Sequence, residues 1–213
     1  MIYYVADPTS SRALDACENH GFGALLGPHR LTVPRLRLAL DNGAWKCRDN
    51  PESWAETFES RFYDRLSNIG SKVDFAVAPD LVCRPESILF TLKHLGRVLL
   101  HTSVALIAVQ NGMIPSQVSG MLSKRVGIAI GGSTEWKEET CYTWARLCAA
   151  RGAWCHMLRA NTTRRIELAR AAGCTSADGS SVAMFADTAP LIARALRTPA
   201  QVDLCRLSRV ERD

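Results

Sequence analysis

The chain has 213 residues, of which 47% are apolar, and it carries a formal net charge of +5 at pH 7. No apolar run approaches the roughly 20 residues that a membrane-spanning helix needs, and the first residues lack the pattern of a signal peptide, so no membrane partner and no export signal are expected. The modest positive charge permits an acidic partner such as nucleic acid but does not require one.

Short apolar segments recur along the chain and are predicted to be β-strands. In chain order they are Ile2–Ala6, Phe22–Leu26, Leu36–Leu40, Asp74–Ala78, Val104–Val109, Val126–Ile130, Trp154–Leu158 and Cys174–Ala177. Two of them, at 104–109 and 126–130, are apolar on both faces, which is typical of parallel strands that are covered on both sides.

Helical signals lie between these segments. Helices are predicted after a cap at Asn50, with Pro51 in the first turn, after a cap at Ser133, after a cap at Asn161 as far as Gly173, and from about Val182 to Leu196. In the first of them, Trp54, Phe58, Phe62 and Leu66 recur every four residues and form one apolar face.

The alternation of eight strands with helices predicts a compact α/β fold, a (β/α)8 barrel of the TIM type. No linker or repeat divides the chain, so one domain spanning residues 1–213 is expected. A doubly wound open sheet is the alternative, because loss of a short strand at 22–26 or 174–177 would prevent closure of the barrel.

The eight cysteines indicate free thiols rather than a metal site or a disulfide framework. None of them forms a CxxC pair, and Cys141, Cys148 and Cys155 are seven residues apart, which is a helical spacing. Most lie beside apolar residues, as buried thiols do. A reducing cytoplasm, no metal and no cofactor are therefore expected.

Polar residues follow most of the predicted strands, which is where TIM barrels carry their chemistry. They are Asp41-Asn42-Gly43, Pro79-Asp80, Gln110-Asn111-Gly112, Gly131-Gly132-Ser133, His156 to Arg159, and Asp178-Gly179. Each has a structural explanation when taken alone: Asx-Gly pairs favour turns, Asp80 can cap a helix, and His156 is typical of a hydrogen-bonded core histidine. Their recurrence at corresponding strand ends favours one shared site.

Carboxylates in such a ring suit chemistry at a sugar carbon. One carboxylate can attack the anomeric carbon while a second protonates the leaving group. An additional carboxylate and an amide supply the donors and acceptors that a nucleobase edge requires, and an aromatic ring such as Trp45 can stack on the base.

These residues resemble the tRNA-guanine transglycosylase superfamily, most closely its small phage and bacterial relatives that act on DNA. The similar segments are "DNGAW" at 41–45, "APD" at 78–80, "VQNG" at 109–112, the glycine pair at 131–132, "HML" at 156–158 and Asp178. They occur in the order of the family's motifs over about residues 36 to 181.

The resemblance assigns roles to individual residues. Asp178 would be the nucleophile and Asp41 the general acid, so Asp178 must stay ionised while Asp41 must hold a proton. The base would be bound by Asp80, Gln110, Asn42, Gly131 and Gly132 and sandwiched by Trp45 and Met157. The arginines at 159, 164 and 165 would contact phosphates, although a solvated helix start explains them equally well.

The chain also departs from the tRNA enzymes, which carry a Cys/His zinc subdomain after the barrel. Cys205 is the one cysteine that follows Asp178, so no such zinc site is expected. The polynucleotide substrate is therefore expected to be different from tRNA. "DNGAW" replaces the family's Asp-Ser-Gly-Gly-aromatic segment, which alters the contacts around Asp41.

The resemblance implies exchange of guanine in DNA for a 7-deazaguanine base, such as the 7-cyano form used in queuosine-related chemistry, through a covalent Asp–deoxyribose intermediate. The expected partners are DNA, single-stranded or with a flipped base, and the free 7-deazaguanine, in the cytoplasm of a bacterium or a phage-infected bacterium. The alternatives are a tRNA-guanine transglycosylase, a nucleosidase acting on free nucleosides, and a non-catalytic nucleic-acid-binding barrel. Oligomeric state is not predicted.

Overall fold

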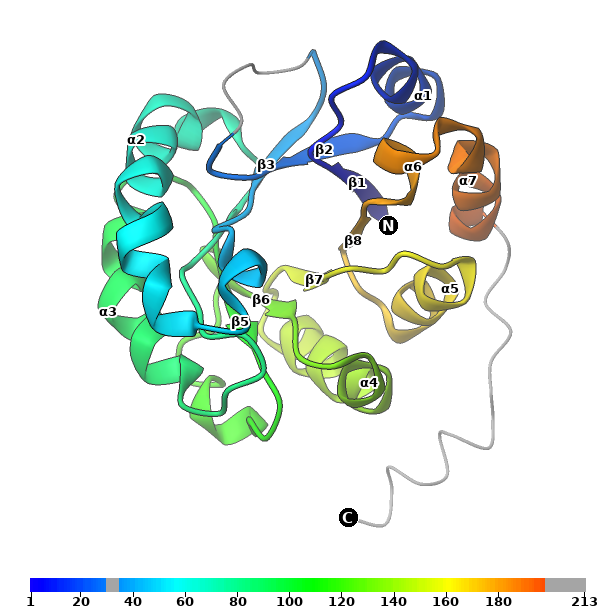
Figure 1. Cartoon of the computed structure of the whole chain (residues 1–213). Helices are drawn as coiled ribbons and strands as arrows, with labels where there is room; N and C mark the ends of the chain where they lie inside the picture. The colour runs from blue at the N-terminus through cyan, green and yellow to red at the C-terminus, as the bar shows by residue number, and fades with distance from the viewer. Residues whose placement is uncertain (30–34, 198–213) are drawn as a thin grey trace.

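The computed structural model describes residues 1–29 and 35–197, so that Cys205 lies outside the described residues. Eight parallel strands form a closed barrel in which neighbours follow chain order from β1 to β8. Figure 1 looks along this barrel and shows the helices arranged around it. The predicted (β/α)8 barrel is thereby confirmed, and the open sheet is excluded.

The strands are short. They are β1 (Ile2–Ala6), β2 (Gly23–Leu26), β3 (Leu38–Leu40), β4 (Ala76–Val77), β5 (Ala105–Val109), β6 (Val126–Ile130), β7 (Cys155–Met157) and β8 (Ser176–Gly179). The predicted bounds of β8 were wrong, since Asp178 and Gly179 belong to the strand and Cys174 precedes it. The strand includes Asp178 and Gly179 because both pair with β1, where Asp178 lies beside Tyr4.

The helices of the described residues are unevenly distributed. They are α1 (Ser11–His20), α2 (Ser60–Ile69), α3 (Ser87–Leu99), α4 (Thr134–Ala150), α5 (Thr163–Ala172), α6 (Ser181–Met184) and α7 (Ala189–Arg197). Short 3-10 turns are η1 (Ala44–Cys47), η2 (Pro51–Ser53), η4 (Gly70–Lys72), η5 (Pro115–Gln117) and η6 (Ala186–Thr188). Between β5 and β6, where every residue is described, η5 is the only helical segment, so this connection contains no α-helix.

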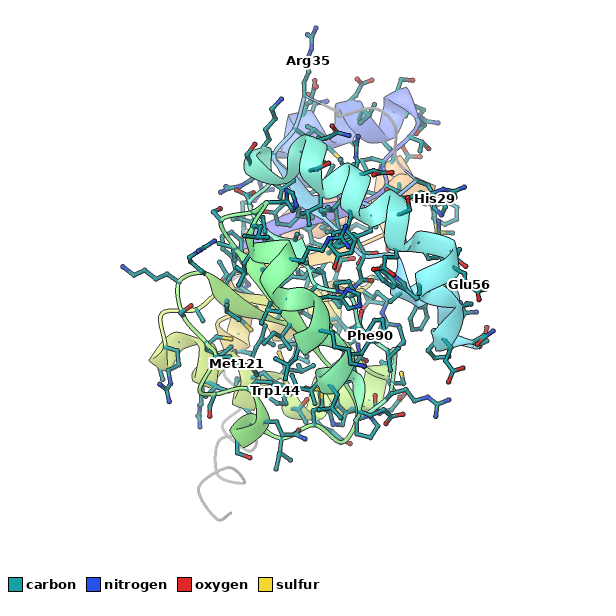
Figure 2. All side chains as sticks on the ribbon, turned by 90° about the vertical axis from the view of Figure 1, so that its left-hand side faces the viewer. His29, Arg35, Glu56, Phe90, Met121 and Trp144 are labelled. Carbon is teal, nitrogen blue, oxygen red and sulfur yellow. The ribbon has the colours of Figure 1, made fainter. Side chains whose placement is uncertain are left out.

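A π-helical turn, η3 (Ala55–Glu59), precedes α2. The residues Trp54, Phe58, Phe62 and Leu66 are all buried. A spacing of four exceeds the 3.6 residues of an α-helical turn, and the wider π turn keeps these side chains on one face. Figure 2 shows α2 and α3 side by side on the side of the molecule that is at the left in Figure 1, with Glu56 pointing outward.

Two predicted helix boundaries were wrong, and a third position, Asn50, precedes a helical turn without capping it. Asn50 makes no capping hydrogen bond through its side chain, although Pro51 does occupy the first turn. The cap of α5 is Thr162 rather than Asn161, whose side chain instead accepts a hydrogen bond from the Ser180 amide. The last helix is interrupted at Phe185, where the backbone leaves the helical conformation, before α7 begins.

The predicted cap at Ser133 is confirmed, because its hydroxyl accepts a hydrogen bond from the Trp136 amide at the start of α4. Of the predicted caps Asn50, Ser133 and Asn161, Ser133 is thus the one that caps its helix through its side chain. A hydroxyl or amide beside a helix start caps it only where the backbone places that side chain over the first free N–H groups.

Apolar side chains form two layers. One fills the barrel interior and includes Leu25, Phe75 and Leu106, while the larger one lies between the barrel and the helices. Successive residues of each strand alternate between the layers, and this alternation decides which side chain at each strand end reaches the interior. Within residues 1–29 and 35–197, none of the helices has the length and apolar character needed to cross a bilayer.

Candidate functional site

A pocket of about 230 Å³ opens at the carboxyl ends of the strands. Eight of the predicted site residues line it: Asp41, Asn42, Trp45, Asp80, Gln110, Gly131, Arg159 and Asp178. Drug-sized ligands occupy pockets of roughly 300–1,000 Å³, so this one suits a single small ring system.

Asp80 is held by two side-chain amides. Asn42 Nδ2 donates to Asp80 Oδ1 at 2.7 Å and also to the Ala78 carbonyl, while Gln110 Nε2 donates to Asp80 Oδ2. The Gln110 side-chain oxygen in turn accepts from the Gly132 and Cys83 amides. This network fixes the orientation of both groups, with the Asp80 carboxylate as an acceptor and the Gln110 amide nitrogen as a donor.

Burial raises the pKa of Asp80 to about 6, and the hydrogen bonds from Asn42 and Gln110 oppose this rise. The amides thus favour the ionised form of a carboxyl group that its surroundings would otherwise keep protonated.

Asp41 lies just after β3, in the Asx-Gly turn that the sequence suggested. Its side chain accepts a hydrogen bond from the Gly43 amide at 3.2 Å, and Asn42 Oδ1 accepts from the Ala44 amide. Gly43 has a φ of 80°, a left-handed conformation that glycine adopts without steric cost. Asp41 therefore takes part in the turn and also lines the pocket, so the two explanations of this segment are compatible.

Burial, followed by the negative charges of Asp178 and Asp80, raises the pKa of Asp41 to about 7. Neighbouring carboxylates cannot all ionise at low energetic cost in a partly dry cavity. Asp41 is thus able to hold a proton near neutral pH.

Asp178 lies in β8 and is 3% exposed. Its Oδ1 accepts hydrogen bonds from the Arg159 amide at 3.0 Å and from His156 Nε2 at 3.1 Å. Among the hydrogen bonds of the described residues, both that reach this side chain fall on Oδ1, so Oδ2 is the oxygen left for a ligand. The carboxylate is consequently fixed in orientation and still accessible from the pocket.

Arg159 supplies positive charge at the pocket. Its guanidinium donates to the Gly132 carbonyl and lies 3.6 Å from the centre of the Trp45 ring. Trp45, in η1, is 43% exposed. A flat ligand that stacked on the covered face of this ring would have to displace the guanidinium.

Lys137 does not line the pocket but supports residues that do, and no sequence pattern predicts this role. It lies in the first turns of α4, it is 1% exposed, and its ammonium donates to the Leu158 carbonyl at 2.6 Å and to the Arg159 carbonyl at 3.4 Å. Arg159 itself has a φ of 57°, which is unusual for a residue with a side chain. Lys137 and Asp178 therefore hold this turn from two sides.

Four predicted site residues do not line the pocket. Met157 is buried in the outer apolar layer, and Leu158 lines the pocket instead, because neighbouring residues of a strand face opposite sides. Gly132 contributes only backbone contacts, to Gln110 and Arg159. The side chains of Arg164 and Arg165 both bond to Glu138, at 2.6 and 2.9 Å.

The prediction that the cysteines are free thiols is confirmed for those among the described residues. Cys141, Cys155 and Cys174 are buried free thiols, and the Cys174 sulfur lies 3.9 Å from that of Cys141 and 3.8 Å from that of Cys155. Over the part of the chain that the structure describes, no three His, Cys, Asp or Glu side chains are grouped so as to hold a metal ion. The site therefore offers carboxylates, amides and a guanidinium as its chemical groups.

No protein-family model and no curated protein matches the chain. Among solved structures, the chain is similar to a cube-shaped, highly porous protein cage designed by fusing symmetric oligomeric domains. The identity is 14%, the TM-score is 0.53, and the alignment covers 99% of this chain and 74% of that one. This similarity concerns the fold alone.

Proposed function

We propose that the protein is a base-exchange transglycosylase that replaces guanine in DNA with a 7-deazaguanine base. The observation that carries the proposal is that two aspartates far apart in the chain, Asp41 and Asp178, line one pocket together with Asp80 and Gln110. The resemblance of these strand ends to the tRNA-guanine transglycosylase superfamily supports the same assignment.

In this mechanism a guanine is flipped into the pocket, where its edge meets Asp80, Gln110 and the backbone at Gly131. Asp178 Oδ2 attacks C1′ of the deoxyribose and the bond from C1′ to N9 breaks. The bonding electrons stay with guanine, which takes the proton held by Asp41. A covalent ester between Asp178 and the sugar then holds the DNA strand.

The second half reverses these steps with a different base. A 7-deazaguanine enters the pocket and gives its N9 proton to Asp41, which is now a carboxylate. N9 attacks C1′ and Asp178 leaves as a carboxylate, so that the enzyme regains its starting protonation. The raised pKa of Asp41 supports this assignment, because one group must donate and then accept a proton near neutral pH.

The pocket volume of about 230 Å³ also supports base exchange, since it suits one base rather than a whole nucleotide. The sugar and phosphates would remain outside, near Trp45 and Arg159. Such an arrangement fits a base presented from a polymer by flipping.

The test is incorporation of label. Purified protein is incubated with radiolabelled guanine or 7-cyano-7-deazaguanine and with DNA, tRNA or free deoxyguanosine. The proposal predicts acid-precipitable label in DNA. Label in tRNA alone would identify a tRNA enzyme, release of guanine from deoxyguanosine alone would identify a nucleosidase, and binding of DNA without either reaction would identify a binding protein.

A further inference from the structure

A chain of polar groups runs through the barrel interior directly beneath Asp178. Trp154 Nε1 donates to Ser176 Oγ at 2.8 Å, Ser176 Oγ lies 2.8 Å from His156 Nδ1, and His156 Nε2 lies 3.1 Å from Asp178 Oδ1. The register of β7 and β8 explains this order. His156 is paired with Ser176, and Asp178 is the next inward-facing residue of β8.

The donors and acceptors of this chain determine its direction. An ionised carboxylate only accepts hydrogen bonds, so His156 Nε2 must carry the proton shared with Asp178. His156 Nδ1 is then an acceptor. Ser176 accepts from Trp154 and has one proton of its own, which it donates to His156 Nδ1. Every group is satisfied when His156 is neutral and carries its proton on Nε2, which is the tautomer that the inference requires.

The imidazole is also fixed in space. His156 is fully buried, and its ring centre lies 4.9 Å from that of Phe75 and 6.1 Å from that of Tyr4. These rings pack against the imidazole, whose Nε2 lies toward Asp178. The mechanism described above makes no use of this histidine.

We propose that His156 is a positioning residue for Asp178, an inference that rests on the proposed function. By holding Oδ1 from below, together with the Arg159 amide, it turns Oδ2 toward the sugar carbon that Asp178 is to attack. Such pre-orientation lowers the cost of reaching the attacking geometry. His156 itself does not touch the substrate.

The test compares His156→Phe, His156→Gln and Ser176→Ala in single-turnover formation of the covalent adduct with a guanine-containing DNA oligonucleotide at saturation. Loss of one hydrogen bond to a charged group predicts a rate roughly 10- to 100-fold lower in His156→Phe. His156→Gln keeps an N–H donor and should recover much of the rate, and Ser176→Ala should lose less. The dissociation constant for the oligonucleotide should stay unchanged in all three.

His94→Phe is the matched control, because His94 also bonds to a hydroxyl, that of Tyr63 at 2.8 Å, and packs among aromatic rings away from the pocket. Its adduct rate per folded molecule should equal that of the wild type. A wild-type rate in His156→Phe, or an equal loss in His94→Phe, would overturn the inference.

Nitrogen-15 NMR of labelled histidine gives a readout that is independent of activity and of whether the Phe variant folds. It should show His156 protonated at Nε2 and bare at Nδ1, and a proton at Nδ1, whether or not Nε2 also carries one, would contradict the network. Failure of the wild-type protein to form any adduct with DNA, RNA or deoxyguanosine would instead overturn the proposed function, while the tautomer would still report on the hydrogen bond.

Discussion

Asp41 and Asp178 line the same pocket, and the charge of Asp178 is, after burial, the largest influence that raises the pKa of Asp41 to about 7. The two side chains are both carboxyl groups, but their surroundings differ. Asp41 can hold a proton at neutral pH, and Asp178 is fixed by two N–H donors on one oxygen. Carboxyl pairs whose surroundings separate them in this way can divide the work of acid and nucleophile.

The first prediction concerns the pH dependence of guanine release. Because Asp41 donates its proton in that step, the single-turnover rate should be highest below the pKa of about 7 and should fall as the pH rises through it. Asp41→Asn should lower the rate by about 10² to 10⁴ and remove this fall. The measurement is the adduct rate at a series of pH values.

Asp64→Asn, at an exposed position of α2, is the control for loss of one negative charge. It should leave both the rate and its pH dependence as they are in the wild type. An Asp41→Asn profile that falls at the same pH as that of the wild type would show that another group provides the proton.

The second prediction concerns the glycine beside Gln110. A Cβ added at Gly131 would lie 2.7 Å from Gln110 Nε2 and 3.1 Å from the Val109 carbonyl. Gly131→Ala should therefore push the amide away from Asp80 and destabilise the fold by about 1–3 kcal/mol. Denaturant unfolding measures the stability, and calorimetry with 7-cyano-7-deazaguanine measures base binding, which should weaken.

Gly96→Ala is the matched control, since no atom lies within 4 Å of a Cβ at this position of α3. There alanine should stabilise the helix by about 0.5–1 kcal/mol. If Gly131→Ala is as stable as the wild type and binds the base equally well, the close packing of Gln110 against Gly131 does not shape the site.

The third prediction concerns Lys137. Burial is the main cause that lowers the pKa of this lysine to about 7, and its ammonium serves the carbonyls of Leu158 and Arg159. Lys137→Met keeps a similar volume but takes the ammonium donor away from the partly buried carbonyls of Leu158 and Arg159. It should reduce the free energy of unfolding by about 1–3 kcal/mol.

Lys124→Met replaces an exposed lysine and should change stability by no more than about 0.5 kcal/mol. Chemical denaturation of the two variants side by side makes the comparison. Equal stability of Lys137→Met and the wild type would show that these carbonyls need no partner.

The fourth prediction concerns binding of the DNA backbone. Arg164 and Arg165 share Glu138 as a partner, so a phosphate must compete with that carboxylate. The double variant Arg164→Ala, Arg165→Ala should bind all DNA sequences more weakly and lower the slope of log K against log salt by up to about 2. Fluorescence anisotropy at several salt concentrations measures this slope.

Glu138→Gln is the complementary variant, because it frees both guanidinium groups. It should bind DNA more tightly than the wild type and with a steeper dependence on salt. Unchanged slopes in both variants would place the phosphates elsewhere on the protein.

The sequence predicted the barrel because its strands are apolar on both faces, and it predicted the site because polar residues follow those strands. Asp41, Asp80 and Gln110 were found in this way, and the structure brings them to one pocket. Strand ends can be predicted where a buried run stops at a polar residue, since an unpaired polar side chain is costly inside the barrel.

The failures have equally local causes. Met157 was expected at the pocket where Leu158 lies, because a shift of one residue along a strand reverses every side chain. Lys137 follows Trp136 in an amphipathic helix, and nothing in the sequence separates its buried ammonium from a solvated one. His156 was expected to be a satisfied core histidine, which it is, but its partner Asp178 depends on the register of β7 and β8.

The most direct test of the account is the intact mass of the protein after incubation with a guanine-containing DNA oligonucleotide and a denaturing quench. The account predicts a species equal to protein plus oligonucleotide minus one guanine, with the linkage mapped to Asp178 in a peptide digest. Asp178→Asn should fold normally and give none of it. The same adduct in Asp178→Asn, or base exchange by the wild type through no covalent species, would contradict the claim that Asp178 is the nucleophile.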